Sequence, residues 1–261
     1  MKLRSQSELI NELLALAEGI AQKAGELLSD RPDSFDIHQK SSTRDFATHM
    51  DHASEKLIVN AILAARPGDG IIGEEGAHLE SQSGITWVID PIDGTVNYFY
   101  NLPGWNISIA AKDEEGVLVG VVYAPTLNSL WRASRGGGAF LNDRAIHCSD
   151  VGELKEALIA TGFSYDAEER VLQGEKIAAL IPKVRDIRRN GAAAVDLCHV
   201  ASGAVDGYFE SGLKEWDLAA GGLIAREAGA LVSGRNGAPA GEAMVIAAGP
   251  TLHTLLTSEI G

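Results

Sequence analysis

The sequence predicts an α+β half followed by an α/β half, and two observations support this prediction. Residues up to about 149 contain two long amphipathic helical segments and then six short strand-like runs in succession. From about residue 150, strand-like and helical segments alternate instead. No Pro/Ser-rich linker or low-complexity tract separates the halves, so we expect one compact unit with an N-terminal lobe (1–149) and a C-terminal lobe (150–261).

The N-terminal half begins with two predicted helices. Apolar residues recur at helical spacing over about residues 7–29, and Ser5 with Glu8 matches a capping box. Thr48 and Asp51 are the cap partners of a second helix, which stops before Pro67. The six strands are expected at residues 70–73, 85–89, 107–111, 117–123, 129–133 and 138–141.

The C-terminal half alternates between the two kinds of element, which is typical of α/β units. The expected strands are residues 157–161, 186–189 and 207–210. The expected helices are residues 167–180, 192–202 and 216–228.

Composition argues against several classes of protein. The chain has 36 acidic and 22 basic residues among 261, and the resulting formal charge of −14 disfavours nucleic acid or an anionic membrane as a partner. Two cysteines provide neither a disulfide framework nor a zinc site built from paired thiolates. The N-terminus runs into an amphipathic helix, and no stretch approaches about eighteen uninterrupted apolar residues. We therefore expect a cytoplasmic protein without a membrane partner.

The segment from Trp87 to Thr95 places two carboxylates, Asp90 and Asp93, at the end of an apolar strand with a proline between them. Hard oxygen ligands this close together suit Mg²⁺, or Mn²⁺ as its substitute. The Gly-Thr pair behind them predicts a phosphate-binding helix start. The alternative is an Asp-Pro turn followed by an Asx-capped helix, and this segment alone does not decide between the two.

Three further acidic residues have a structural alternative beside the functional one. Glu74 follows the short strand 70–73 and could meet Asp90 at neighbouring strand ends, although a Glu-Glu pair in a turn is commonly a solvated loop. Asp217 lies in the first turn of a predicted helix, where Asp is also a favoured cap, but the Ala-Ala-Gly-Gly run behind it indicates close packing. Asp51 is either a cap partner or an acid near the metal site.

Other motifs do not support a function. Gly68 to Gly73 matches the dinucleotide pattern G-x-G-x-x-G, but it precedes a strand instead of linking a strand to a helix. His49 and His52 lack the i, i+4 spacing of helical zinc sites, so we interpret them as surface residues. Because no G-x-S-x-G elbow and no Cys/His pair is evident, water is the expected attacking group.

Taken together, Gly73-Glu74-Glu75, the segment from Asp90 to Thr95, and Trp216-Asp217-Leu-Ala-Ala-Gly resemble the inositol monophosphatase family of Mg²⁺-dependent, lithium-sensitive phosphatases in order and spacing. The resemblance runs from Lys40 to Gly229. It implies a layered αβαβα sandwich of the inositol monophosphatase/fructose-1,6-bisphosphatase type, usually a homodimer. It also implies Mg²⁺, two or three ions, and a small-molecule phosphate monoester as the substrate.

The resemblance implies the site residues as well. The expected metal ligands are Glu74, Asp90, the Ile92 carbonyl, Asp93 and Asp217. The expected catalytic residues are Glu74, Thr95 and Asp51, which hydrogen-bonds toward Thr95. The expected substrate contacts are Asp93, Gly94, Thr95, Ala193, Glu210 and Asp217. Lys214 replaces a histidine of animal members, and Phe163 replaces a polar residue of some members, so the identity of the alcohol stays open.

The expected reaction is hydrolysis of myo-inositol monophosphate by metal-activated water. One alternative is a related phosphatase acting on fructose 1,6-bisphosphate, histidinol phosphate, 3′-phosphoadenosine 5′-phosphate or NADP. The other is a non-catalytic metal-binding regulatory or scaffold protein. The intact set of acidic residues together with Thr95 speaks against the latter.

Overall fold

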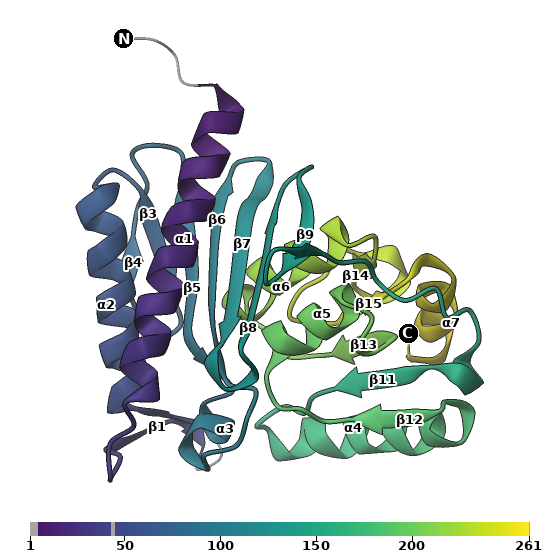
Figure 1. The fold of residues 1–261 in the computed structure, drawn as a ribbon. Coiled ribbons are helices and arrows are strands. Elements are labelled where there is room, and N and C mark those ends of the chain that lie inside the picture. Colours follow the sequence, from purple (N-terminus) through teal and green to yellow (C-terminus); the bar gives the residue numbers. More distant parts are fainter. Residues whose placement is uncertain (1–4, 43–44, 261) are drawn as a thin grey trace.

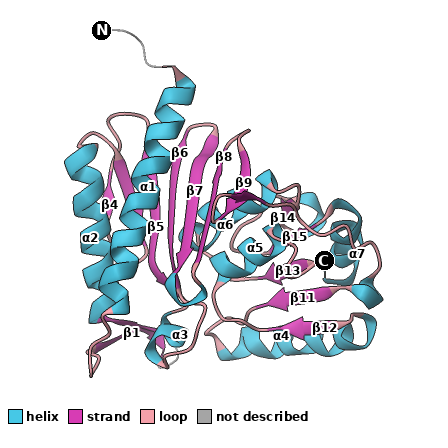
Figure 2. Ribbon diagram, in the orientation of Figure 1, coloured by secondary structure: helices cyan, strands magenta, loops and turns pink. Residues whose placement is uncertain are grey.

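The computed structural model describes residues 5–42 and 45–260, whose elements stack in layers (Figure 1, Figure 2). Helices α1 (Gln6–Ser29) and α2 (His49–Ala65) cover one face of an eight-stranded sheet. Helices α5 (Ala193–Ala201) and α6 (Glu215–Glu227) lie between this sheet and a five-stranded one. The far face of the smaller sheet is covered by α4 (Ala167–Leu180) and α7 (Pro250–Ile260). The predicted αβαβα sandwich is confirmed.

The larger sheet has the strand order β10-β9-β8-β7-β6-β5-β3-β4. Its strands are β3 (Gly70–Gly73), β4 (His78–Leu79), β5 (Thr86–Asp93), β6 (Asn106–Asp113), β7 (Gly116–Ala124), β8 (Ser129–Ser134), β9 (Gly138–Leu141) and β10 (Arg144–Ala145). All neighbours are antiparallel except β3 and β5. The six predicted strands are confirmed, whereas β4 and β10 were missed because two residues carry no periodic pattern.

Both predicted starts of the N-terminal helices are confirmed. At α1, the Ser5 hydroxyl accepts the N–H of Glu8 (3.3 Å), and the Glu8 carboxylate accepts the N–H of Ser5 (2.9 Å). At α2, Asp51 accepts both the N–H and the hydroxyl of Thr48, each at 2.7 Å. A hairpin of β1 (Ile37–Ser42) and β2 (Asp45–Thr48), which the sequence analysis did not predict, leads into α2.

The smaller sheet has the strand order β12-β11-β13-β15-β14. Its strands are β11 (Leu158–Thr161), β12 (Asp186–Arg188), β13 (Gly207–Glu210), β14 (Leu231–Ser233) and β15 (Val245–Ala248). The first three in this order are parallel and follow the predicted alternation, while β15 is antiparallel to both of its neighbours, β13 and β14. The sequence analysis missed β14, β15 and α7. Strand β15 is fully buried and therefore shows no alternation of polar and apolar residues, and β14 has only three residues.

The Ala-Ala-Gly-Gly run of α6 allows the close packing that the sequence predicts. A methyl group on Gly221 would come within 3.0 Å of the carbonyl oxygen of Ala194 in α5. On the other side of the helix, a methyl group on Gly120 of β7 would come within 2.9 Å of the main chain of Ala220. Since real Cβ contacts are longer than this, small residues are required here. They bring the first turn of α6, with Asp217, against the larger sheet.

The remaining helical turns are short. Single 3₁₀ turns lie in loops at η1 (Pro125–Leu127), η2 (Leu154–Glu156), η3 (Ile181–Lys183) and η4 (Arg235–Gly237). None of the helices within residues 5–42 and 45–260 is long and apolar enough to span a membrane. The two sheets divide the sequence near residue 150, but α5 and α6 pack on both, so the two-lobe organisation stays a prediction.

Candidate active site

A bulge in β5 brings Asp90 and Asp93 to the same side of the strand. Against β6, Asp90 pairs with Ser108 and Asp93 pairs with Asn106, so three steps along β5 match two steps along β6. Because side chains alternate along a strand, residues three apart normally face opposite sides, and the extra residue cancels this. Pro91, which has no N–H for the ladder, lies in the bulge. The strand therefore continues four residues beyond its predicted end.

The carboxylate of Asp93 connects β5 to the start of α5. Its Oδ1 accepts the N–H of Ala193 (3.1 Å), and its Oδ2 accepts the N–H of Ala194 and Nδ2 of Asn106 (both 2.8 Å). Burial raises the pKa of Asp93, and these donors lower it, with a rise as the net effect. Ala193, a predicted substrate contact, thus gives its N–H to a predicted metal ligand.

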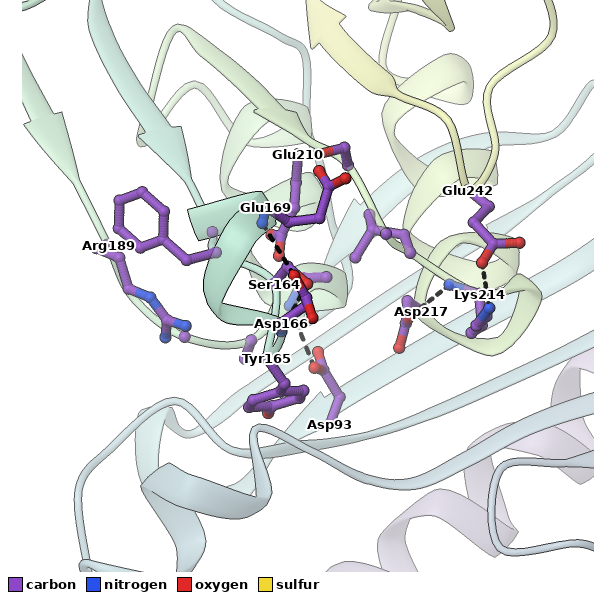
Figure 3. Close-up of a pocket in the computed structure, with 18 of the residues that line it drawn as sticks. Asp93, Ser164, Tyr165, Asp166, Glu169, Arg189, Glu210, Lys214, Asp217 and Glu242 are labelled. Carbon is purple, nitrogen blue, oxygen red and sulfur yellow. Dashed lines mark hydrogen bonds and ion pairs between the residues drawn. The ribbon is translucent and has the colours of Figure 1, made fainter. Parts of the chain in front are cut away.

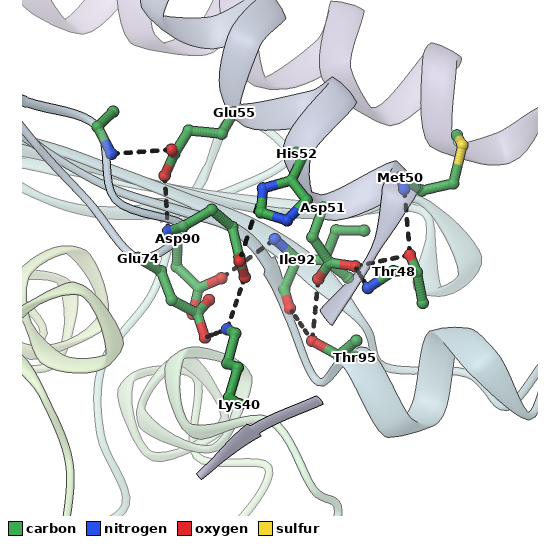
Figure 4. A network of polar contacts seen from close by, with 12 residues as sticks. Lys40, Thr48, Met50, Asp51, His52, Glu55, Glu74, Asp90, Ile92 and Thr95 are labelled. Atoms are coloured by element: carbon green, nitrogen blue, oxygen red, sulfur yellow. Dashed lines mark hydrogen bonds and ion pairs between the residues drawn. The ribbon is translucent and has the colours of Figure 1, made fainter. Parts of the chain in front are cut away.

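Parallel pairing of β3 with β5 places Glu74 beside Asp90. The N–H of Glu74 donates to the carbonyl oxygen of Ile89 (3.1 Å), which is the residue before Asp90. The two side chains therefore leave neighbouring strands at the same level, as the sequence predicts (Figure 4). Burial raises the pKa of Glu74, whereas the neighbouring ammonium group of Lys40 lowers it.

Glu55 of α2 holds the turn that carries Glu74. Its carboxylate accepts the N–H groups of Glu75 (2.9 Å) and Ala77 (3.0 Å), and a methyl group on Gly73 would come within 2.2 Å of it. Burial raises the pKa of Glu55, and the two N–H groups lower it. The sequence analysis missed this residue. The available signal was its position one helical turn after Asp51, on the same face of α2.

Asp90 and Asp217 are each affected by the charges of three other carboxylates. Burial raises the pKa of Asp90 well above the usual range. The charges of Glu74, Asp93 and Asp217 raise it further. The pKa of Asp217 is likewise raised well above its usual range, by burial first and then by Asp93. The four carboxylates, which come from three distant segments, therefore interact with one another.

These side chains are not arranged as a finished coordination sphere. Within residues 5–42 and 45–260, no three His, Cys, Asp or Glu side chains are close enough to enclose a metal ion. The carboxylates instead point at protein donors, such as Lys40 for Glu74 and the N–H of Lys214 for Asp217. The site nevertheless fits a cation, because buried, mutually repelling carboxylates form an oxygen-only donor set. Binding would require these side chains to rotate toward a shared point.

Lys40 of β1 is the counter-cation of this group. Its ammonium donates to Oε1 of Glu74 (2.8 Å) and to Oε1 of Glu75 (2.6 Å). Burial lowers the pKa of Lys40, but the two carboxylates outweigh this effect and raise it. A divalent cation at Glu74 would have to compete with this ammonium group.

We therefore expect Lys40→Met to increase the apparent affinity for Mg²⁺ at least about threefold, because a competing charge is removed. Isothermal titration calorimetry measures this change. Lys183→Met, which removes the surface pair with Glu259, is the matched control and should leave the affinity unchanged. Equal affinities for the wild type and Lys40→Met would show that the ammonium does not compete.

Thr95 and Asp51 lie behind the carboxylates. The Thr95 hydroxyl is 3.1 Å from Oδ1 of Asp51 and 3.1 Å from the carbonyl oxygen of Ile92, so it can donate to either acceptor (Figure 4). Burial raises the pKa of Asp51 to about 6, against the hydrogen bonds from Thr48, which lower it. The predicted hydrogen bond between Asp51 and Thr95 is present, and Asp51 also completes the capping box with Thr48 at the start of α2.

Gly94 turns the chain into the short helix α3 (Thr95–Phe99). Its φ is +85°, a conformation that side chains disfavour, and a Cβ would come within 3.1 Å of Ala192. The first N–H groups of a helix have no acceptor within the helix. The turn can therefore direct N–H groups toward an anion, which agrees with the sequence interpretation.

A cavity of about 690 Å³ opens beside these residues (Figure 3). Five predicted site residues line it, namely Asp93, Gly94, Ala193, Glu210 and Asp217. Five others belong to the network of Figure 4 and do not line it, namely Asp51, Glu74, Asp90, Ile92 and Thr95. Phe163 and Lys214, the two departures from the family pattern, also line the cavity.

The wall formed by Glu210, Lys214 and Glu242 is mainly acidic. Burial raises the pKa of Glu210 to about 7, while the hydroxyl of Tyr208, which donates to it at 2.7 Å, lowers the pKa. Lys214 forms an ion pair with Glu242, and its N–H donates to Asp217 (2.6 Å). Asp217 therefore caps α6 and also lines the cavity, so the two interpretations of this residue are compatible.

The comparison with known proteins agrees with this geometry. The model of the inositol monophosphatase family matches residues 9–260. The chain belongs to this family. The resemblance identified from the sequence is confirmed, and family membership indicates a phosphatase that is generally metal-dependent.

Two relatives of this family differ in what their names say. The chain is 43% identical over 233 residues to "Nus factor SuhB" of Pasteurella multocida, covering 87% of each chain. It is 40% identical over 235 residues to "Inositol-1-monophosphatase" of Mycobacterium leprae, covering 86% of this chain and 81% of the relative. The solved structure of the extragenic suppressor protein suhB of Bartonella henselae is 31% identical, with a TM-score of 0.91, and covers 95% of this chain and 98% of that one.

Sequence reasoning missed several residues around the family motifs. Asn106 holds Asp93, and its own Oδ1 is buried without a hydrogen-bond partner among the described residues. The motif pointed to neither Asn106 nor Glu55, because both act across elements that are distant in sequence. Tyr165 and Arg189 line the cavity but lie outside every motif considered.

Proposed function

We propose that the chain hydrolyses the phosphate monoester of a small polyol in a Mg²⁺-dependent reaction, with myo-inositol monophosphate as the first candidate. One observation carries the proposal. Mutually interacting carboxylates at the end of β3, in β5 and in the first turn of α6 lie beside a cavity that Gly94, the residue before α3, also lines. Charge of this kind is costly in a fold unless cations or substrates use it.

The ligands of two or three Mg²⁺ ions would be the carboxylates of Glu74, Asp90, Asp93 and Asp217 and the carbonyl of Ile92. Bound cations would lower the pKa of the attacking water and stabilise charge on the leaving oxygen, and Mn²⁺ would substitute for Mg²⁺. Asn106 and the first N–H groups of α5 donate hydrogen bonds to the carboxylate of Asp93 and would fix its orientation. Residues that hydrogen-bond to metal ligands commonly have this effect.

Thr95 would orient the attacking water. When its hydroxyl donates to Asp51, the Thr95 oxygen presents lone pairs that accept a hydrogen bond from water. Although burial raises the pKa of Asp51 to about 6, its carboxyl group is mainly ionised at pH 7 and above and can accept the hydrogen bond from the Thr95 hydroxyl. Glu74 would be the second acceptor for the same water.

The phosphate and the alcohol part of the substrate would contact different sides of the cavity. The N–H groups of Gly94 and Thr95 would hold the phosphate. Ala193 and Glu210, which line the cavity, would contact the alcohol. The carboxyl group of Glu210, whose pKa is about 7, can accept or donate a hydrogen bond to a hydroxyl near neutral pH.

Two alternatives remain from the sequence. The same site would serve fructose 1,6-bisphosphate, histidinol phosphate, 3′-phosphoadenosine 5′-phosphate or NADP. The name of one relative, "Nus factor SuhB", is the reason to retain a regulatory role as an alternative for this chain. Such a role could accompany phosphatase activity or replace it. The intact pair of Thr95 and Asp51 favours turnover, because a scaffold would not need a hydroxyl held beside acidic ligands.

Phosphate release from a panel of these esters, with and without Mg²⁺ and with Li⁺, tests the proposal. We expect Mg²⁺-dependent release that Li⁺ inhibits. A panel without phosphate release at millimolar Mg²⁺ would instead favour the non-catalytic alternative. A homodimer and a cytoplasmic location, which the sequence also suggested, stay predictions.

A further inference from the structure

An arginine without a partner lines the cavity. Arg189 follows β12, and within residues 5–42 and 45–260 its guanidinium forms neither a hydrogen bond nor an ion pair. Its neighbour Arg188 differs, since it pairs with Asp186 at 2.6 Å and does not line the cavity. A guanidinium has five donors in a planar fork that suits phosphate and carboxylate groups. The N–H groups of Arg189 that have no acceptor in the described structure are therefore suited to an anionic group of a ligand in the cavity.

The position of Arg189 is next to the phosphate-binding turn. A methyl group on Gly191 would come within 2.4 Å of Nη1 of Arg189, and the carbonyl oxygen of the same glycine packs against Gly94. Tyr165 shares this side of the cavity (Figure 3), and the positive charge of Arg189 acts on its phenol. The phenol can donate a hydrogen bond to the same acceptor.

The wall formed by Lys214, Glu242 and Asp217 is less suited to binding an anion than the side of Arg189. Lys214 is already paired with Glu242, and Asp217 adds an acidic group there (Figure 3). Glu210 is within reach of the positive charge of Arg189, which lowers the pKa of Glu210 against the larger effect of burial. A second negative group on the alcohol would find open donors at Arg189, whereas the ammonium group of Lys214 is already paired. The cavity, at about 690 Å³, lies in the range of about 300–1,000 Å³ that accommodates ligands larger than a simple polyol phosphate.

We infer that Arg189 and Tyr165 form an anion subsite, and that the preferred substrate is a phosphate monoester whose alcohol part bears a second anionic group, a phosphate or a carboxylate. This inference rests on the proposed function and narrows its substrate class. Arg189 would act as a specificity residue, because the charge it neutralises is not on the phosphate that is cleaved.

Rates with matched pairs of esters test the subsite. Inositol 1-phosphate is compared with inositol 1,4-bisphosphate, and glycerol 3-phosphate with 3-phosphoglycerate, so that the second group is a phosphate in one pair and a carboxylate in the other. We expect the second anion to raise kcat/KM about tenfold or more in at least one pair, mainly through KM. Arg189→Gln should remove this advantage, because it should lower kcat/KM much more for the ester with the second anion than for the simple monophosphate.

Two variants serve as controls. Arg188→Gln should retain the full advantage, and Arg189→Lys should retain part of it because the charge remains without the fork. An equal loss of kcat/KM for both members of a pair in Arg189→Gln would place the guanidinium on the reacting phosphate and overturn the subsite. Loss of the advantage in Arg235→Gln alone, the other unpaired arginine of the described cavity wall, would also overturn it.

Calorimetric binding in Mg²⁺ separates this inference from the proposed function. Turnover of both members of each pair at equal rates by the wild type would overturn the subsite and leave the phosphatase in place. Absence of turnover, combined with binding of inositol 1,4-bisphosphate that is about tenfold weaker in Arg189→Gln, would overturn the phosphatase and leave the subsite. Neither turnover nor binding would overturn both.

Discussion

Replacing Asp93 by Asn should lower kcat/KM by at least tenfold, which corresponds to about 1.4 kcal/mol of barrier. The amide keeps the shape of the side chain but removes the charge of a proposed Mg²⁺ ligand. The fold should persist, because burial already makes the charged form of Asp93 unfavourable on balance. The amide oxygen can still accept a hydrogen bond from the start of α5 or from Asn106, while the NH₂ group that replaces the other oxygen cannot accept from the remaining donor.

Steady-state kinetics and thermal melting should be measured on the same preparations. Asp143→Asn is the matched control, since this carboxylate is 89% exposed and pairs only with Arg132 among the described residues. It should keep the wild-type rate. More than a tenth of the wild-type rate in Asp93→Asn, at saturating Mg²⁺, would refute the role proposed for Asp93. A collapsed melting transition would instead show that Asp93 is mainly structural.

Millimolar Mg²⁺ should raise the melting temperature, and the increase should grow as the pH rises from about 5 to 8. A ligand at 100 times its dissociation constant stabilises the native state by about 2.7 kcal/mol. For chains of this size each kcal/mol corresponds to roughly 2–4 °C. The expected increase at pH 8 is therefore several degrees.

The sign of the pH dependence follows from the raised pKa values. A carboxyl group with a raised native pKa keeps its proton in the folded state after the unfolded chain has lost it. Without Mg²⁺, stability should therefore fall as the pH rises above about 4, until the native pKa is passed. That upper limit is about 6 for Asp51 and about 7 for Glu210, and it also lies above the usual range for Asp90 and Asp217.

Mg²⁺ competes with protons for these carboxylates, so its effect should be small at pH 5 and large at pH 8. Groups with lowered pKa values, such as Asp113, change the stability with pH in the opposite direction. Their contribution is the same with and without Mg²⁺, so it cancels in the difference between the two melting temperatures. Differential scanning fluorimetry across this pH range measures the difference. An equal melting temperature with and without Mg²⁺ at pH 8 would count against the metal site.

The sequence predicted those parts of the fold that have a local signal. The two N-terminal helices carry capping boxes and long periodic faces, and the six longer strands of the large sheet carry apolar runs. The acidic motifs were recognisable because three of them occur together in family order. No comparable pattern marks the short strands β4, β10 and β14, the fully buried β15, or the hairpin of β1 and β2.

The site depends on contacts that no local pattern encodes. The bulge at Pro91 is visible only from the register between Asp90 and Asp93 on one strand and Ser108 and Asn106 on the next. The hydrogen bonds from α5 to Asp93 span about 100 residues of sequence. The unpaired state of Arg189 is likewise a property of its surroundings. Such features follow from tertiary packing, which spacing alone does not specify.

The central claim is that acidic side chains from three segments share divalent cations beside the cavity. Anomalous diffraction from crystals soaked in Mn²⁺ tests it most directly. We predict at least one anomalous peak within about 2.0–2.4 Å of carboxylate oxygens of Asp90 and Asp93, with Glu74 or Asp217 as a further ligand. Saturating Mn²⁺ that gives no peak there, or peaks only at surface carboxylates, would contradict the account.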